Sequence, residues 1–150
     1  MITVKIHPGV DAESELSSLE KAARLTVRHE VTEDVDLTVL ISDESHLREL
    51  NRRFRNVDSE TDVLAFPAGE IDPDSGHRYL GDVVISFPAA STQADSAGHS
   101  VGAELVLLTV HGVLHLFGYD HDEAQAKTRM WEAQAAILAE MGLHNLEIDD

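Results

Sequence analysis

The chain has 150 residues, of which 43% are hydrophobic and 26% are charged, and it contains no cysteine. A chain of this length buries roughly 70% of its unfolded surface as one domain, so we expect a single domain over residues 1–150. The lack of cysteine excludes disulfides, thiol nucleophiles and thiolate zinc sites, and the formal net charge of −17 argues against non-specific wrapping of nucleic acid.

Two strands and two helices are predicted to alternate in the first half of the chain. Residues Ile2–His7 alternate between apolar and polar side chains, and Val35–Ile41 is a second strand rich in β-branched residues. Apolar residues recur at helical spacing from Ser14 to about His29 and again over Asp43–Arg55. The apolar stripe of this second helix consists of Leu47, Leu50 and Phe54.

Two further short strands are predicted near the middle of the chain, and two helices follow them. The strands are Thr61–Phe66 and Leu80–Phe87, separated by a loop rich in Gly, Pro and Asp. A long helix runs from about Ser100 to Phe117, and the last helix spans Asp122 to about Gly142, with Gln125 placed as in a capping box. Because the strands lie mainly in the first half and the helices dominate the second, with no regular βαβ alternation along the whole chain, we expect an α+β fold with a small mixed sheet covered by about four to five helices.

Nothing in the sequence predicts export or membrane insertion. The first eight residues lack the basic region and apolar run of a signal peptide, and no stretch of 18 apolar residues occurs. We therefore expect a cytoplasmic protein that does not bind a membrane.

Three histidines near the end of the long helix have the spacing of a metal site. His111 and His115, at i and i+4, share one helix face, and Gly118 can supply the left-handed turn that brings His121 back towards them. Three neutral imidazoles leave the fourth tetrahedral position of Zn²⁺ open to water, as in catalytic sites. We predict one zinc ion per chain, on the penultimate long helix and the turn after it.

Other interpretations of the motif remain open. Metzincin proteases share this spacing but need a Glu as general base after the first His, where this chain has Gly112. A non-catalytic protein, in which zinc only holds the last two helices together, would require a fourth protein ligand. The candidates near enough in sequence are Asp120, Asp122 and Glu123.

Arginines concentrate in the second predicted helix. Arg48, Arg52 and Arg55 lie on one helix face, where they either pair with nearby acids or bind phosphate. Arg55 differs from the other two because it stands where the helix gives way to a loop. A guanidinium at that position can hold a phosphate through two hydrogen bonds.

With these pieces in order, the sequence closely resembles the YbeY family of ribosomal RNA maturation factors over about residues 35–142. The matching segments are Leu50-Asn51, Phe54-Arg55 with Asp58, Thr61–Pro67, Leu80–Ser86 and His111–His121. The resemblance implies a zinc-dependent, single-strand-specific endoribonuclease that helps mature the 3′ end of small-subunit ribosomal RNA and takes part in ribosome quality control. It also implies that RNA and the ribosome are the partners, that no nucleotide cofactor is used, and that Arg55 is a functional arginine. Within this resemblance, the non-catalytic alternative is a ribosome-assembly factor whose zinc only holds the last two helices together.

Two mechanisms fit such a site equally well at this stage. Zinc-bound hydroxide could attack the phosphodiester, or the metal could polarise the phosphoryl oxygen while the ribose 2′-hydroxyl attacks. In both, Arg55 would stabilise charge on the non-bridging oxygens. The candidates for orienting imidazoles or water are Asp62, Asp82 and Asp120, and none is assigned as the base.

Overall fold

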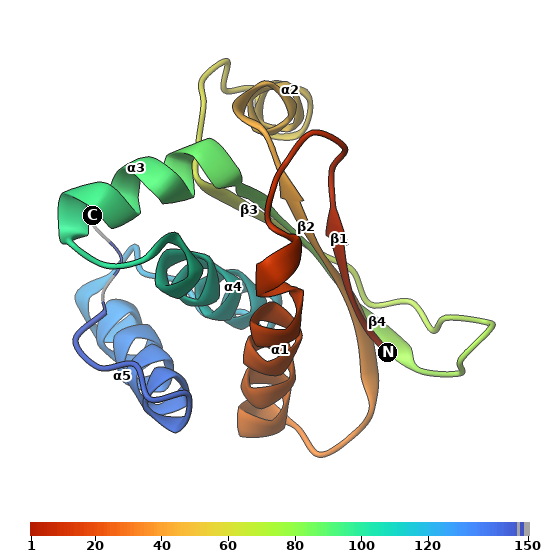
Figure 1. The fold of residues 1–150 in the computed structure, drawn as a ribbon. Coiled ribbons are helices and arrows are strands. Elements are labelled where there is room, and N and C mark those ends of the chain that lie inside the picture. The colour runs from red at the N-terminus through yellow and green to blue at the C-terminus, as the bar shows by residue number, and fades with distance from the viewer. Residues whose placement is uncertain (147, 149–150) are drawn as a thin grey trace.

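The computed structural model describes residues 1–146 and 148, which form a four-stranded sheet and five α-helices (Figure 1). In chain order the elements are β1 (Ile2–Ile6), a single 3-10 turn (Glu13–Glu15), α1 (Leu16–Glu30), β2 (Val35–Ser42), α2 (Glu44–Arg55), β3 (Val63–Pro67), β4 (Arg78–Ser86), α3 (Phe87–Ala97), α4 (Val101–Leu116) and α5 (Ala124–Glu140).

The sheet is mixed, as predicted, with the strand order β1-β2-β4-β3. The pairs β1–β2 and β2–β4 are parallel, whereas β3 runs antiparallel to β4 and forms an edge of the sheet. The prediction of an α+β fold with a small mixed sheet and helices is therefore confirmed. The structure also gives the order of the strands, which the sequence did not predict.

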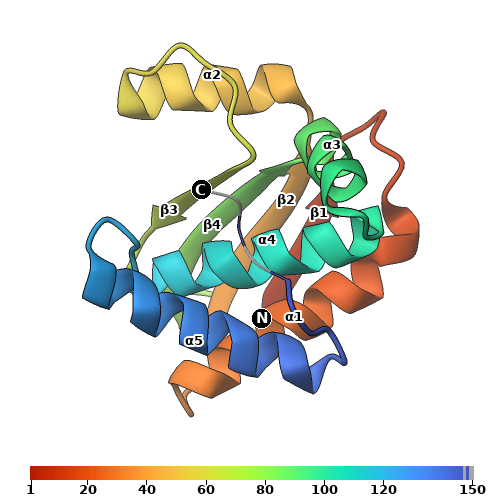
Figure 2. The same cartoon turned by 90° about the vertical axis from the view of Figure 1, so that its left-hand side faces the viewer.

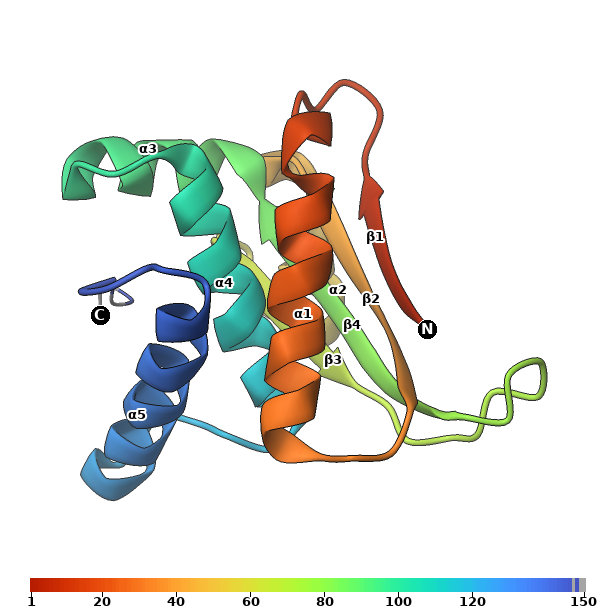
Figure 3. The same cartoon turned by 60° about the horizontal axis from the view of Figure 1, so that its bottom comes forward.

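The two faces of the sheet are covered unequally. Helices α1 and α4 lie on one face, and α5 runs alongside α4 on the side away from the strands (Figures 2 and 3). On the other face α2 covers only a small separate cluster formed by Leu47, Leu64 and Val84. Residues next to these in the strands, such as Val63 and Val83, point to the main core instead, because successive strand residues face opposite sides.

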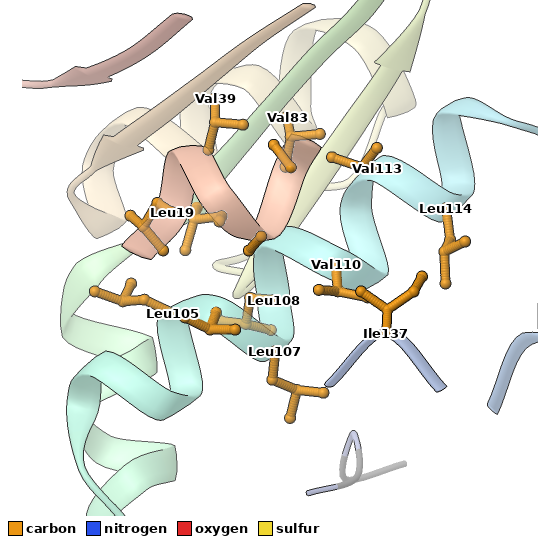
Figure 4. Close-up of a cluster of buried hydrophobic side chains, with 14 of the residues drawn as sticks. Leu19, Val39, Val83, Leu105, Leu107, Leu108, Val110, Val113, Leu114 and Ile137 are labelled. Atoms are coloured by element: carbon orange, nitrogen blue, oxygen red, sulfur yellow. The ribbon is translucent and has the colours of Figure 1, made fainter. Parts of the chain in front are cut away.

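Helix α4 is the centre of the main core and is buried on nearly all sides. Its side chains pack between the sheet and Ile137 of α5 (Figure 4). A Cβ atom at Gly112 would lie 2.5 Å from Val83 Cγ1, so the helix approaches the sheet as closely as it does only because this residue is glycine. The position that holds a catalytic Glu in metzincins therefore faces the sheet in this fold.

Two helix predictions need correction. Helix α3 was not expected from the sequence, although Ser86 caps it by accepting a hydrogen bond from the amide of Ala89 and Gly98 ends it in a left-handed conformation. Helix α5 begins at Ala124, two residues after the predicted start at Asp122, and within the described residues its N-cap, Glu123, makes no side-chain capping hydrogen bond. The Asp122 amide instead donates to the Asp120 side chain, which places Asp122 in the preceding turn.

Among the described residues, no single helix is long and apolar enough to cross a membrane. Helices α3 and α4 meet that length and composition only as a pair, and they are bent by 115° at their junction.

Candidate metal centre

The C-terminal end of α4 and the turn after it form a compact scaffold for the three histidines. The amide of Gly118 donates to the His115 carbonyl (3.0 Å) and that of Tyr119 to the Leu114 carbonyl (3.2 Å). These two bonds make a Schellman motif, which requires a left-handed residue, and Gly118 has a φ of +96°. The turn directs the chain back towards α4, as the sequence had predicted for this glycine.

The structure brings the three predicted histidines together. The nitrogens that His111, His115 and His121 can offer to a metal ion lie within 4.8 Å of one another. The Nε2 atoms of His111 and His115 are 3.0 Å apart, close to the roughly 3.3 Å expected for two ligands of a tetrahedral zinc with bonds of about 2.0–2.1 Å. The donor set therefore fits a first-row transition metal.

Carboxylates do not complete this cluster in the part of the chain that the structure describes. The metal-ligating group found there consists of imidazoles only. Asp120 and Asp122, two of the acids that a structural zinc site would need, line the cavity beside the histidines but do not belong to the group. Three ligands with an adjoining cavity correspond to the open arrangement of catalytic zinc sites.

Two imidazoles are oriented by partners on their far side. His111 Nδ1 lies 2.5 Å from Gln134 Oε1 of α5, and His115 Nδ1 lies 2.7 Å from the Tyr119 carbonyl oxygen. Both partners accept hydrogen bonds, so Nδ1 carries the proton and Nε2 keeps its lone pair for a metal. Burial lowers the pKa of His115, which favours the neutral form needed in a ligand.

The sequence interpretation missed both orienting groups. Gln134 is 2% exposed and lies on the buried stripe of α5, between Met130 and Ile137. A polar residue on an apolar stripe is a detectable signal, but the sequence does not say which element it faces. The Tyr119 carbonyl belongs to the backbone and leaves no mark in the sequence.

A cavity of about 650 Å³ opens beside the histidines and contains the other predicted site residue. Arg55 lines it from the end of α2, the three histidines line it from α4 and the following turn, and edge strand β3 forms much of the remaining wall. Residues distant in sequence therefore converge on one space, which holds a guanidinium, three imidazoles and the carboxylates of Asp62, Asp120 and Asp122.

The other two arginines of the predicted face are engaged in ion pairs. Arg48 Nε lies 2.8 Å from Asp58, and an Arg52 guanidinium nitrogen lies 2.7 Å from Glu49. Arg55 forms no ion pair with any residue in 1–146 or 148. The sequence left open whether these arginines pair with nearby acids or bind phosphate; Arg48 and Arg52 pair with acids.

The three candidate aspartates fall in different places. Asp62 lines the cavity and accepts hydrogen bonds from the amide of Val63 (2.8 Å) and the side chain of Gln93 (3.2 Å). Asp120 also lines the cavity. Asp82 accepts from the Tyr79 hydroxyl and lies next to Val83, so it points away from α4. It does not line the cavity and is not an orienting partner of the histidines.

Comparison with known proteins gives one consistent family. The family model described as Endoribonuclease YbeY matches residues 7–142. Endoribonuclease YbeY of Moorella thermoacetica is 42% identical over 136 aligned residues, covering 85% of this chain and 87% of that protein. The protein of the same name from Chloroflexus aurantiacus is 40% identical, with 95% and 96% covered. Among solved structures, TM1509 from Thermotoga maritima gives a TM-score of 0.62 at 26% identity and covers 95% of this chain and 92% of that one.

Proposed function

This chain belongs to the endoribonuclease YbeY family, and we propose that it is a zinc-dependent endoribonuclease that cuts single-stranded RNA. We further propose that its substrate is the precursor of small-subunit ribosomal RNA, that it acts on the 3′ end in the cytoplasm, and that it serves ribosome quality control together with ribosomal proteins. These finer assignments rest on the family resemblance of the sequence.

The observation that carries the proposal is the convergence of three metal-ligating imidazoles and Arg55 on one cavity. A phosphodiester is an anion, and the described part of this cavity offers a guanidinium without an ion pair in the same space as the three histidines. Planar guanidinium groups bind phosphate through two parallel hydrogen bonds. Such a bond pair would hold a phosphodiester between Arg55 and the imidazoles.

His111, His115 and His121 would hold the zinc through neutral imidazole nitrogens. A zinc ion supplies Lewis acidity, which polarises a phosphoryl oxygen or lowers the pKa of water towards neutrality. Gln134 and the Tyr119 carbonyl fix the proton of their histidines on Nδ1, away from the cavity. Arg55 would stabilise negative charge that builds on the non-bridging phosphate oxygens. Attack by hydroxide and by the 2′-hydroxyl are both compatible with these roles.

The test is cleavage of an end-labelled RNA that contains single-stranded and duplex segments. We expect cleavage in the single-stranded segments by zinc-loaded protein and none after chelation, with recovery when zinc is restored. The variant His115→Ala should be inactive, whereas His144→Ala, a histidine outside the cavity lining, should cleave normally. Cleavage that persists in the chelated protein would contradict zinc dependence.

The same preparations address the non-catalytic alternative. A zinc that only staples α4 to α5 would raise the melting temperature of the protein without any cleavage of RNA. Stabilisation by zinc with no RNA cleavage in any metal-loaded sample would therefore overturn the proposed activity.

A further inference from the structure

Phe54 departs from the behaviour expected of its place in the sequence. It continues the apolar stripe of α2 after Leu47 and Leu50, yet it is 62% exposed while Leu47 is completely buried. Large exposed apolar side chains are informative when they gather with other features of a binding site. Phe54 lies directly before Arg55, which lines the cavity.

The ring of Phe54 is held in a defined position. Its centroid lies 5.5 Å from that of Phe66 on edge strand β3, in an edge-on arrangement. The guanidinium carbon of Arg53 lies 5.3 Å from the same ring centre. Phe66 stands between Ala65 and Pro67, both of which line the cavity. The exposed ring is therefore supported by the same strand that forms the cavity wall.

The charges around this ring favour an anionic ligand. Arg53 and Arg55 flank Phe54 in sequence, and neither forms an ion pair with the residues that the structure describes, in contrast to Arg48 and Arg52. In a chain with a net charge of −17, two arginines without an ion pair among the described residues thus adjoin one exposed aromatic residue in the sequence. This combination of cation and aromatic surface is the one that single-stranded nucleic acids bind.

We propose that Phe54 is a stacking platform for one base of single-stranded RNA, with Arg55 on the phosphate in the cavity and Arg53 on a phosphate further along the strand. The inference rests on the proposed function, because it extends the RNA path from the cavity onto the end of α2. Stacking on an aromatic ring tolerates any base and requires the base to be unpaired. The platform would therefore select single strands over duplexes without selecting a sequence.

The first experiment measures binding of a short labelled 2′-O-methyl oligoribonucleotide by fluorescence anisotropy. We expect Phe54→Leu to weaken binding by about 5- to 150-fold, the range that loss of one stacked base produces, and Phe54→Trp to bind at least as tightly as the unmodified chain. Ile71→Leu is the matched control, because Ile71 is 61% exposed and does not line the cavity. Circular dichroism would verify that all three variants are folded.

An oligonucleotide series with one abasic position separates stacking from a general loss of contact area. An abasic position at the platform should weaken binding to the unmodified chain and have little further effect on Phe54→Leu. Equal affinity of Phe54→Leu and the unmodified chain would overturn the platform while leaving the endoribonuclease proposal standing, and would leave the ring as a contact surface for a protein. If the unmodified chain fails to bind RNA at all, the proposed function itself fails.

The salt dependence of binding tests the part assigned to Arg53. Each phosphate neutralised on a single strand contributes about 0.7 to the slope of log affinity against log salt. Arg53→Gln should lower the slope by about that amount, whereas Arg52→Gln, whose guanidinium is already paired with Glu49, should leave it nearly unchanged. An unchanged slope for Arg53→Gln would remove Arg53 from the RNA path.

Discussion

Replacement of Gln134 by leucine should weaken zinc binding although Gln134 is not a ligand. Gln134 and His111 are 2% and 4% exposed, so water cannot replace the hydrogen bond between them. Leucine has a similar volume but no acceptor, so the buried Nδ1–H of His111 loses its hydrogen bond to Gln134 Oε1 at a cost of about 1–3 kcal/mol. The proton can avoid that cost by moving to Nε2, where it would compete with the metal.

Both the loss of the Nδ1–H hydrogen bond and a proton on Nε2 destabilise the metal-bound form. We therefore expect zinc affinity to fall by about 10- to 100-fold, as for other groups that orient a metal-binding histidine. The assay is competition with a chromophoric chelator, combined with nitrogen NMR of the metal-free protein to identify which nitrogen of His111 is protonated. Gln125→Leu is the control, because Gln125 is exposed on the same helix. Unchanged zinc affinity and an unchanged His111 tautomer in Gln134→Leu would refute the reasoning.

Further predictions concern the metal, the packing of α4 and the binding of phosphate by Arg55. The protein should bind one zinc ion per chain, alanine at any of the three histidines should remove most of it by elemental analysis, and occupancy should fall as the pH drops through about 6 because the ligands must be deprotonated. Gly112→Ala should lower the free energy of unfolding, measured by urea titration, by about 1–3 kcal/mol, because the added Cβ would collide with the rigid Val83 side chain. Gly102→Ala on the same helix is the control and should be close to neutral, because only the flexible end of the Glu15 side chain lies near the added Cβ. Arg55→Lys should slow RNA cleavage, because lysine keeps the charge but loses the planar guanidinium, and Arg55→Ala should slow it more. Zinc content and melting temperature should be unchanged in both variants. Cleavage at the wild-type rate by Arg55→Ala would show that phosphate binding by Arg55 is not needed.

The elements that the sequence predicted well are those whose side chains show a strong period. Strands β1, β2 and β4 and helices α1, α2 and α4 were expected within a few residues of their actual bounds, because apolar spacing reports directly on which face is buried. Helix α3 was missed because only Ala90 and Ala94 are buried in it, which is too weak a stripe to detect. The residues that cap α3, Ser86 and Gly98, are typical of helix ends. Ser86 falls within the strand predicted over Leu80–Phe87, however, and Gly98 lies just before the helix predicted from Ser100, so they were not recognised as the ends of a separate helix.

In the candidate site, features set by neighbouring residues could be predicted, whereas features set by contacts distant in sequence could not. The three histidines and Gly118 span eleven residues and obey the geometry of one helix and one turn, so their spacing was sufficient to predict that they meet. Gln134 is 23 residues from the histidine that it orients, and the wall provided by β3 depends on a strand order that spacing does not determine. Arg55 was singled out for its place at a helix end, but its presence in the same cavity as the histidines follows only from the packing of α2 on β3 and β4.

Phe54 illustrates how a failed sequence expectation can carry information about function. The 3.6-residue period assigned it to the packed stripe of α2, and local propensity gave no reason to doubt this. The cluster beneath α2 ends at the edge strand β3, however, so the last position of the stripe extends beyond the surface that could cover it. Phe54 packs edge-on against Phe66, and most of its surface stays exposed. Because positions that break local rules tend to coincide with functional sites, a large exposed aromatic residue between two arginines that form no ion pair within residues 1–146 and 148 is better explained by a ligand that covers the ring than by the fold alone.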